Sequence, residues 1–306
     1  GLTVTLYPVG RDGVADPEQI AAQITSCTRA VYITHYFGFL QPHLDDIRAL
    51  CDARGLRLIE DCALSLLSGV RPAEGRVGDV AIFCLYKFFP VLGGGALVIN
   101  AADLDRRDPF QRAPPWRRVA KDLARSTLTG TLGAERARAA LTLLRGGPPG
   151  REPNVAPPEG QYPDIPAHYY FDPALRNARI SLFAARPMRA FDIAAAIAAR
   201  RANWRLFQRL LVEVPGAEPL FITLPPDACP LSMPVLVADR DRITTRLQAR
   251  GIAATPWWAG YNKRLDWGGM DDAAYLKDHV LSLPLHQFLG AEHVTNIVKV
   301  LREVMG

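Results

Sequence analysis

The first sixty residues alternate between short apolar runs and segments in which apolar residues recur with helical spacing. Asp16 and Pro17 are a typical N-cap and first-turn pair, so a short helix is predicted to follow them. The β-branched run AVYITHYFG at 30–38 predicts a buried strand. Helical spacing returns over 41–54 and ends at Gly55, the expected C-cap.

Three further apolar runs continue the alternation and are predicted to be strands: LRLIE at 56–60, VAIFCLY at 80–86 and ALVIN at 96–100. A turn at 90–95 that contains proline and glycine separates the last two. Because strands that alternate with helices require crossover connections, this half predicts an α/β fold. Its sheet is expected to be mostly parallel and covered by helices on both faces.

The second half of the chain has a different pattern. Residues 115–145 have a helical composition, and 146–166 hold seven prolines, which favours an irregular loop. Helices are then predicted over 187–212, 239–250 and 291–305, with a strand at 231–237. We therefore expect a large cofactor-binding domain at 1–184, which includes the proline-rich loop, and a smaller C-terminal α+β domain at 185–306.

Composition narrows the class of protein. The chain has 306 residues, of which 49% are hydrophobic, and a net charge of +5, as is typical of a globular protein. It lacks an apolar run of membrane-spanning length and the layout of a signal peptide, so we expect a cytoplasmic protein without a membrane partner. The sequence has no stripe of basic residues interleaved with aromatic residues, so no nucleic-acid partner is expected. The five cysteines show no metal-like spacing with the histidines, so no metal is expected.

Two residues of the first half are candidates for chemistry. Asp61 follows a predicted strand at its carboxyl end, the edge where open α/β sheets bind ligands, although a residue that caps the next turn would also fit there. Lys87 follows the next strand among apolar and aromatic neighbours, which would lower the pKa of its amine and make it a nucleophile. The alternative is a lysine whose stem packs on apolar surface while its head reaches water.

Other candidates lie elsewhere in the chain. His35 ends a predicted strand and either stacks near a ligand or is a hydrogen-bonded core residue. His286 follows the run LSLPL and could face a substrate cleft. Trp257 and Trp258 either line a sugar-binding face or pack between the domains.

Three stretches resemble the DegT/StrS family of pyridoxal-phosphate aminotransferases: VYITHYFGFLQPHLDDIRALCDARGLRLIEDCALSLL, GDVAIFCLYKFFPVLGGGALVIN and VLSLPLHQFLGAEHVTNIVKVLREVM. The similarity runs from Tyr7 to the end and is poor over 105–165. It implies a fold type I architecture, a homodimer with active sites at its interface, and pyridoxal 5′-phosphate as cofactor. It also implies transfer of an amino group from an amino-acid donor such as glutamate to a keto sugar linked to a nucleotide.

The resemblance implies roles for individual residues. Lys87 matches the lysine that holds the cofactor as a Schiff base and shuttles a proton, and Asp61 matches the aspartate that keeps the pyridine nitrogen protonated. Asn177 fits an asparagine that reaches the cofactor phosphate of the partner subunit, and Cys84 is the nearest match to a phosphate-binding serine. Dehydratase relatives have histidine in place of the lysine, so Lys87 favours transamination over another reaction of the same cofactor.

The sequence departs from the family's pattern in four ways. Those at Leu64, at Gly93 and at the start of the chain favour a second hypothesis, a degenerate member that binds a ligand or partner without catalysis, whereas the presence of Asp61 and Lys87 disfavours it. Leu64 stands where a glutamine is usual, and Gly93 replaces an acidic residue. The interval from Cys84 to Lys87 is shorter than usual. The chain also begins where the family has already completed an N-terminal segment that binds the cofactor phosphate.

Overall fold

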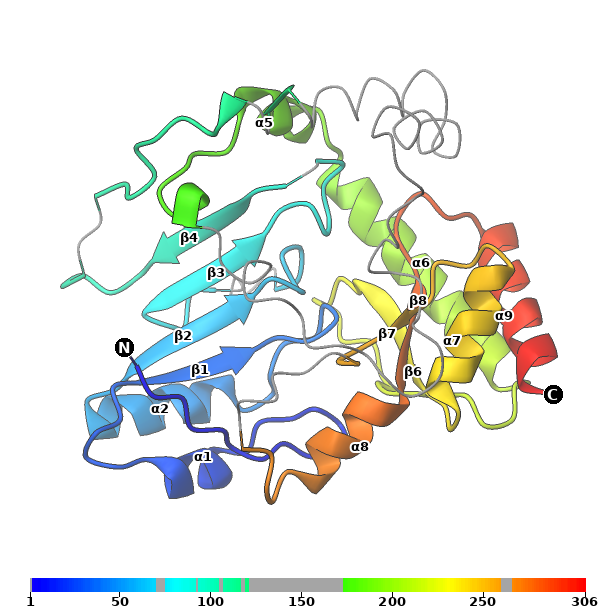
Figure 1. The fold of residues 1–306 in the computed structure, drawn as a ribbon, viewed down its shortest axis with the longest axis horizontal. Helices are drawn as coiled ribbons and strands as arrows, with labels where there is room; N and C mark the ends of the chain where they lie inside the picture. Colours follow the sequence, from blue (N-terminus) through cyan, green and yellow to red (C-terminus); the bar gives the residue numbers. More distant parts are fainter. Residues whose placement is uncertain are drawn as a thin grey trace.

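The structure is a computed structural model that describes residues 2–69, 75–91, 93–104, 107–116, 119–120, 173–259 and 266–306. Two sheets organise these residues, and Figure 1 shows the first in the left half of the view and the second in the right half. Most of the expected helical segment at 115–145 and the whole proline-rich loop at 146–166 lie outside the described residues. Within the described part, no helix has both the length and the apolar character needed to span a membrane.

The helices and strands of the first sheet follow the predicted alternation. The helix α1 (Pro17–Gln23) begins after Asp16, whose side chain accepts a hydrogen bond from the Glu18 backbone N–H. The helix α2 (Leu44–Arg54) ends at Gly55, which adopts the left-handed conformation with φ 63°. The strands are, in order across the sheet, β1 (Ala30–Thr34), β2 (Arg57–Cys62), β3 (Val80–Cys84) and β4 (Gly95–Ile99).

The strand directions confirm a mostly parallel sheet with one exception. The strands β1, β2 and β3 run parallel, whereas β4 pairs with β3 in the antiparallel direction. In its described residues the connection from Cys84 to Gly95 has no crossover helix. The chain therefore turns back, and β4 returns beside β3 as the second strand of a hairpin.

Helices of the described part cover one face of the first sheet. The buried cluster on that side includes Val31, Ile33, Ile47, Cys51 and Leu58. Alternate positions along each strand point to the other face, where Tyr32 and Ile82 are 47% and 38% exposed. The sequence predicts helices on both faces of this sheet, but the described residues place them on one face only. We call the other side, which carries Tyr32 and Ile82, the open face.

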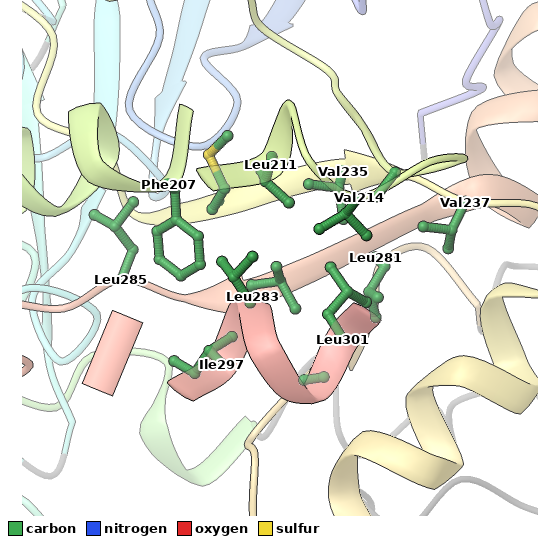
Figure 2. Packing of buried hydrophobic residues seen from close by; sticks show 14 of the residues in the cluster. Phe207, Leu211, Val214, Val235, Val237, Leu281, Leu283, Leu285, Ile297 and Leu301 are labelled. Carbon is green, nitrogen blue, oxygen red and sulfur yellow. The ribbon is translucent and has the colours of Figure 1, made fainter. Parts of the chain in front are cut away.

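The second sheet is antiparallel, with the order β5-β6-β8-β7. Its strands are β5 (Glu218–Pro219), β6 (Ser232–Leu236), β7 (Thr255–Pro256) and β8 (Val280–Pro284). The helices around it are α6 (Ile193–Leu211), α7 (Arg240–Ala249), α8 (Asp271–His279) and α9 (Ala291–Met305), the last of which has the predicted bounds. Figure 2 shows how side chains of α6, β6, β8 and α9 interlock in this core.

The prediction of a single helix over 187–212 is wrong. The chain instead forms α5 (Leu182–Arg189) and α6, with a break between them. The Asp192 side chain accepts a hydrogen bond at 2.9 Å from the Ala195 backbone N–H, and this N-cap begins a new helix. The expected domain boundary after residue 184 therefore falls inside α5.

The loop that follows β1 joins the two halves of the molecule. Phe37 and Phe39 lie just after the first sheet in sequence, but both belong to the core of the second sheet. Gly38 between them has φ 93°, and a Cβ placed there would lie 2.0 Å from the Cys229 carbonyl oxygen. Only glycine permits this close approach, which brings the C-terminal half against the carboxyl end of β1.

Candidate active site

Asp61 lies near the carboxyl end of β2, the middle strand of the three parallel ones. Every second side chain of β2 is buried against the helices, and Asp61 belongs to the alternate, half-buried set. Its register partners are Thr34 of β1 and Ile82 of β3. The carboxylate therefore projects from the open face, at the sheet edge that the sequence indicated.

Two hydrogen bonds fix the Asp61 carboxylate. Its Oδ2 accepts one from the Tyr32 hydroxyl at 2.7 Å, and its Oδ1 accepts one from the Ala63 backbone N–H at 2.9 Å. Burial and the bond to Asp61 raise the pKa of Tyr32 above its ordinary value, so the hydroxyl keeps its proton and remains a donor. Both bonds restrict the direction of the carboxylate.

Lys87 lies in the turn between β3 and β4. The backbone N–H groups of Phe88 and Phe89 donate to the Leu85 carbonyl at 3.2 and 2.9 Å. Burial lowers the pKa of the Lys87 amine below the ordinary lysine value, while the charges of Cys84 and Asp61 act to raise it. The charge of Asp61 thus reaches the Lys87 amine, so the two candidates share one neighbourhood.

Cys84 ends β3 and supports the same turn. The backbone N–H groups of Tyr86 and Lys87 hydrogen-bond to its sulfur. Burial raises the pKa of the Cys84 thiol, although the Lys87 charge acts to lower it. The sulfur is therefore engaged by the backbone of the turn, and its contact with a cofactor phosphate stays a prediction.

His35 lies in a fully buried hydrogen-bond network. Its Nδ1 accepts from the Gln41 backbone N–H at 3.0 Å, which leaves Nε2 to donate to Glu60 at 3.0 Å. Burial raises the pKa of Glu60, but the bonds from His35 and from the Gly78 backbone N–H outweigh it and lower that pKa. The Cys62 sulfur is within 4.8 Å of the His35 and Glu60 ligand atoms. Because both ring nitrogens have partners, the geometry favours a core histidine over a ligand-binding one.

Trp257 and Trp258 pack on the loop that follows β1. The ring centroid of Trp257 lies 4.9 Å from that of Phe37, and the centroid of Trp258 lies 5.1 Å from that of Tyr36. Phe37 and Trp258 have φ 56° and 57°, which is rare for large side chains. These contacts describe packing between the two halves of the molecule, and a sugar contact stays a prediction.

The two remaining predicted residues are less tightly connected to Lys87. Burial, together with the charges of Arg200 and His293, lowers the pKa of the half-buried His286. Its Nδ1 has no hydrogen-bond partner among the described residues. Asn177 is exposed, and its backbone carbonyl accepts a hydrogen bond from the Arg112 backbone N–H at 3.0 Å.

The sequence did not identify two residues of this neighbourhood, Tyr32 and Arg200. Strand alternation could have found Tyr32, because it shares a face with Thr34, the register partner of Asp61. Arg200 is buried, and its guanidinium donates to the Lys87 carbonyl at 3.4 Å, across 113 positions of sequence. No local pattern signals a contact of that range.

Lys87 and Asp61 fit pyridoxal phosphate. A half-buried amine with a lowered pKa is suited to attack an aldehyde carbon, and a fixed carboxylate is suited to bind a pyridinium N–H. Leu64, which stands where the family's glutamine is expected, is 6% exposed and packs inside the protein.

Comparisons with known proteins relate the first part of the chain to one family of aminotransferases. Residues 8–120 match the family model described as the DegT/DnrJ/EryC1/StrS aminotransferase family. An L-glutamine:2-deoxy-scyllo-inosose aminotransferase of Streptoalloteichus tenebrarius is 40% identical over 101 residues, which are 32% of this chain and 24% of that protein. A UDP-N-acetyl-3-dehydro-alpha-D-glucosamine 3-aminotransferase of Acidithiobacillus ferrooxidans is 36% identical over 95 residues, or 29% and 25% of the two chains. The chain thus spans about a quarter of the curated relatives it matches.

Solved structures match over nearly the whole chain. The aminotransferase TlmJ from Streptoalloteichus hindustanus has a TM-score of 0.62 and 21% identity, and the match covers 98% of this chain and 72% of TlmJ. A DegT DnrJ EryC1 StrS aminotransferase from Brucella abortus has a TM-score of 0.64 and 20% identity, with 98% and 73% covered. These matches show the fold type I aminotransferase architecture and confirm the predicted α/β fold class.

Proposed function

We propose that this chain, whose residues 8–120 match the model of the DegT/DnrJ/EryC1/StrS aminotransferase family, is a member of that family and a pyridoxal-phosphate-dependent aminotransferase. The proposed reaction moves an amino group from an amino acid, glutamate in the first instance, to a keto sugar that is linked to a nucleotide. Relatives named as acting on UDP- and dTDP-sugars support the acceptor class, and relatives named for L-glutamine make glutamine the second donor to test.

The observation that carries the proposal is the coupling of Lys87 to Asp61. The amine and the carboxylate come from turns and strands that are neighbours in the sheet, and the charge of one acts on the other. A half-buried amine and a fixed carboxylate on neighbouring strands and turns are the two groups that this cofactor requires at its aldehyde and at its ring nitrogen.

Each candidate residue has its own role in the proposed reaction. When bound, the cofactor supplies a ring that accepts electrons from the substrate carbon. The Lys87 amine would hold the cofactor and would accept and return a proton at the substrate carbon. The Asp61 carboxylate would accept a hydrogen bond from the ring N–H, and the Tyr32 hydroxyl orients that carboxylate. Trp257 and Trp258 would cover the apolar face of the sugar ring, since both remain partly exposed at the junction.

The direct test follows a labelled amino group. The purified chain is loaded with pyridoxal phosphate and given glutamate or glutamine with an isotopically labelled α-amino group and a panel of UDP-, dTDP- and GDP-keto sugars. Mass spectrometry is expected to find labelled amino sugar with wild type and none with Lys87→Ala. Binding of the cofactor with no labelled product from any acceptor would contradict the aminotransferase and favour a non-catalytic binding protein.

We further propose a homodimer in which Asn177 reaches the cofactor phosphate of the partner subunit. The exposure of Asn177 supports this role, because a side chain that serves a second subunit must be free of its own core. Light scattering is expected to give twice the chain mass of 33.6 kDa. A dimer whose affinity for pyridoxal phosphate is unchanged by Asn177→Ala would contradict the assignment of Asn177.

A further inference from the structure

Arg200 is a buried cation surrounded by neutral groups. Its side chain is 2% exposed, and burial lowers the pKa of its guanidinium to about 10. Nη1 donates to the Pro230 and Leu231 carbonyls at 2.9 and 3.0 Å, and Nε donates to the Gln287 Oε1 at 2.8 Å. These acceptors are neutral dipoles and not carboxylates. The Arg200 charge is therefore buried, at a cost in free energy, without an ion pair in the described part of the chain.

The same guanidinium also reaches the turn that carries Lys87. Nη2 donates to the Lys87 carbonyl at 3.4 Å, and the guanidinium carbon lies 4.9 Å from the centroid of the Phe88 ring. Gln287, which Arg200 holds in place, donates through Nε2 to the Phe88 carbonyl at 3.1 Å. Two successive carbonyls of the turn are thus bound by side chains that lie 113 and 199 positions away in sequence.

We propose that Arg200 and Gln287 are positioning residues for Lys87: they clamp the carbonyls of the Lys87–Phe88 turn and so hold the Lys87 amine half-buried beside Asp61. The proposal rests on the proposed function for the meaning of Lys87. Neither positioning residue needs to touch the cofactor. Their contribution is to fix the backbone from which the amine projects.

The surroundings of Lys87 indicate how the pKa of its amine would change if the hydrogen bonds from Arg200 and Gln287 were lost. The Cys84 sulfur at the end of β3 and the Asp61 carboxylate at the end of β2 both act to raise the pKa of the Lys87 amine, and burial opposes them. The Arg200 guanidinium contacts the backbone carbonyl of Lys87. A freed turn would let water reach the amine and remove the effect of burial, so the pKa of the amine would rise.

The test measures the reactivity of the Lys87 amine in the unliganded full chain. The protein is methylated with formaldehyde and cyanoborohydride over a range of pH, and peptide mass spectrometry gives the modified fraction at Lys87 and at the exposed Lys299 as internal reference. In wild type the pH midpoint for Lys87 is expected to lie below that for Lys299. In Arg200→Met and Gln287→Leu it is expected to move up by about one pH unit.

Arg201→Met is the matched control. Arg201 is the next residue of α6 and donates to the Pro225 and Ala228 carbonyls at 2.7 and 2.6 Å, away from the Lys87 turn. This variant loses two partly buried hydrogen bonds and is expected to leave the Lys87 midpoint unchanged. If Arg200→Met does not fold, Gln287→Leu carries the test alone, because Gln287 is only half-buried.

The outcomes separate this proposal from the proposed function. An unmoved Lys87 midpoint in folded Gln287→Leu, or an equal shift in Arg201→Met, overturns the positioning role even when wild type binds pyridoxal phosphate. If the Lys87 midpoint shifts in the two variants but the wild type binds no pyridoxal phosphate covalently, the positioning role of Arg200 and Gln287 is supported and the proposed function is overturned.

Discussion

The Tyr32 hydroxyl lies 2.7 Å from the Asp61 Oδ2 and donates the hydrogen bond that fixes this carboxylate on the open face of the first sheet. The Tyr32 backbone is itself held, because its carbonyl accepts a hydrogen bond from the Tyr7 hydroxyl at 2.9 Å. Since Tyr32 is 47% exposed and lies on the open face, its main contribution is to the carboxylate and not to the core.

Removal of the Tyr32 hydroxyl should weaken cofactor binding without unfolding the protein. We expect Tyr32→Phe to raise the Kd for pyridoxal phosphate roughly tenfold, since a hydrogen bond to a charged group contributes about 1.5–3 kcal/mol. An absorbance titration measures this affinity. Tyr7→Phe is the control, because its hydroxyl contacts the Tyr32 backbone only. Equal affinities in Tyr32→Phe and wild type would contradict the role given to this bond.

Gly38 tests the close approach between the two halves of the molecule. Gly38→Ala would place a methyl group 2.0 Å from the Cys229 carbonyl oxygen, so we expect a loss of about 3 kcal/mol or more of unfolding free energy. Gly13→Ala also has positive φ, at 72°, but its Cβ meets no atom within 4 Å. It should cost only about 1–2 kcal/mol. Urea unfolding measures both, and similar losses would show that the Gly38 contact is not tight.

The buried network around His35 should contribute to stability. Glu60→Leu leaves the His35 Nε2 and the Gly78 N–H unpaired, so we expect a loss of at least about 2 kcal/mol. The control is Glu213→Leu, which removes an exposed ion pair with Arg302 and should change stability by less than about 1 kcal/mol. If both variants unfold at the same urea concentration as wild type, the network is not structural.

Asp79 should make stability depend on pH at the acid end. It accepts hydrogen bonds from Arg48 at 2.8 Å, Arg57 at 2.9 Å and the Leu58 backbone N–H at 2.8 Å. Burial acts to raise the pKa of Asp79, but these bonds outweigh it and lower the pKa from 3.8 to about 2. The unfolded chain therefore binds more protons in this interval, so the free energy of unfolding falls as pH falls through it.

The measurement is urea unfolding from about pH 5 to about pH 2, for wild type and Asp79→Asn. The variant should be less stable near neutral pH and should lose less stability on acidification, because its amide does not titrate. Parallel acid profiles for the two proteins would exclude Asp79 as the group responsible.

Local patterns predicted much of the first sheet and the pair at its edge. The caps at Asp16 and Gly55 are local features, and both are found where the sequence indicates. Asp61 lies near the end of β2 and Lys87 follows the parallel strand β3, and parallel strands bring their carboxyl ends to one edge. For that reason their proximity could be predicted without knowledge of the rest of the chain.

Other features depend on contacts that a local pattern does not contain. The N-cap at Asp192 breaks a sequence whose composition suits one continuous helix, so the sequence predicts one helix where the chain forms α5 and α6. The antiparallel direction of β4 depends on the turn and not on its own apolar residues. The contact of Arg200 with the Lys87 turn requires α6 to be packed against that turn, which only the folded chain defines.

The most direct measurement of the central claim is the site of covalent attachment of pyridoxal phosphate. The full chain is incubated with the cofactor, reduced with borohydride, digested and examined by peptide mass spectrometry. A pyridoxyl group on Lys87 is predicted, together with its strong depletion in Asp61→Asn, which keeps a side chain of the same size but lacks the charge. Attachment spread over the exposed lysines, or attachment at Lys87 that is indifferent to Asp61→Asn, would contradict the account.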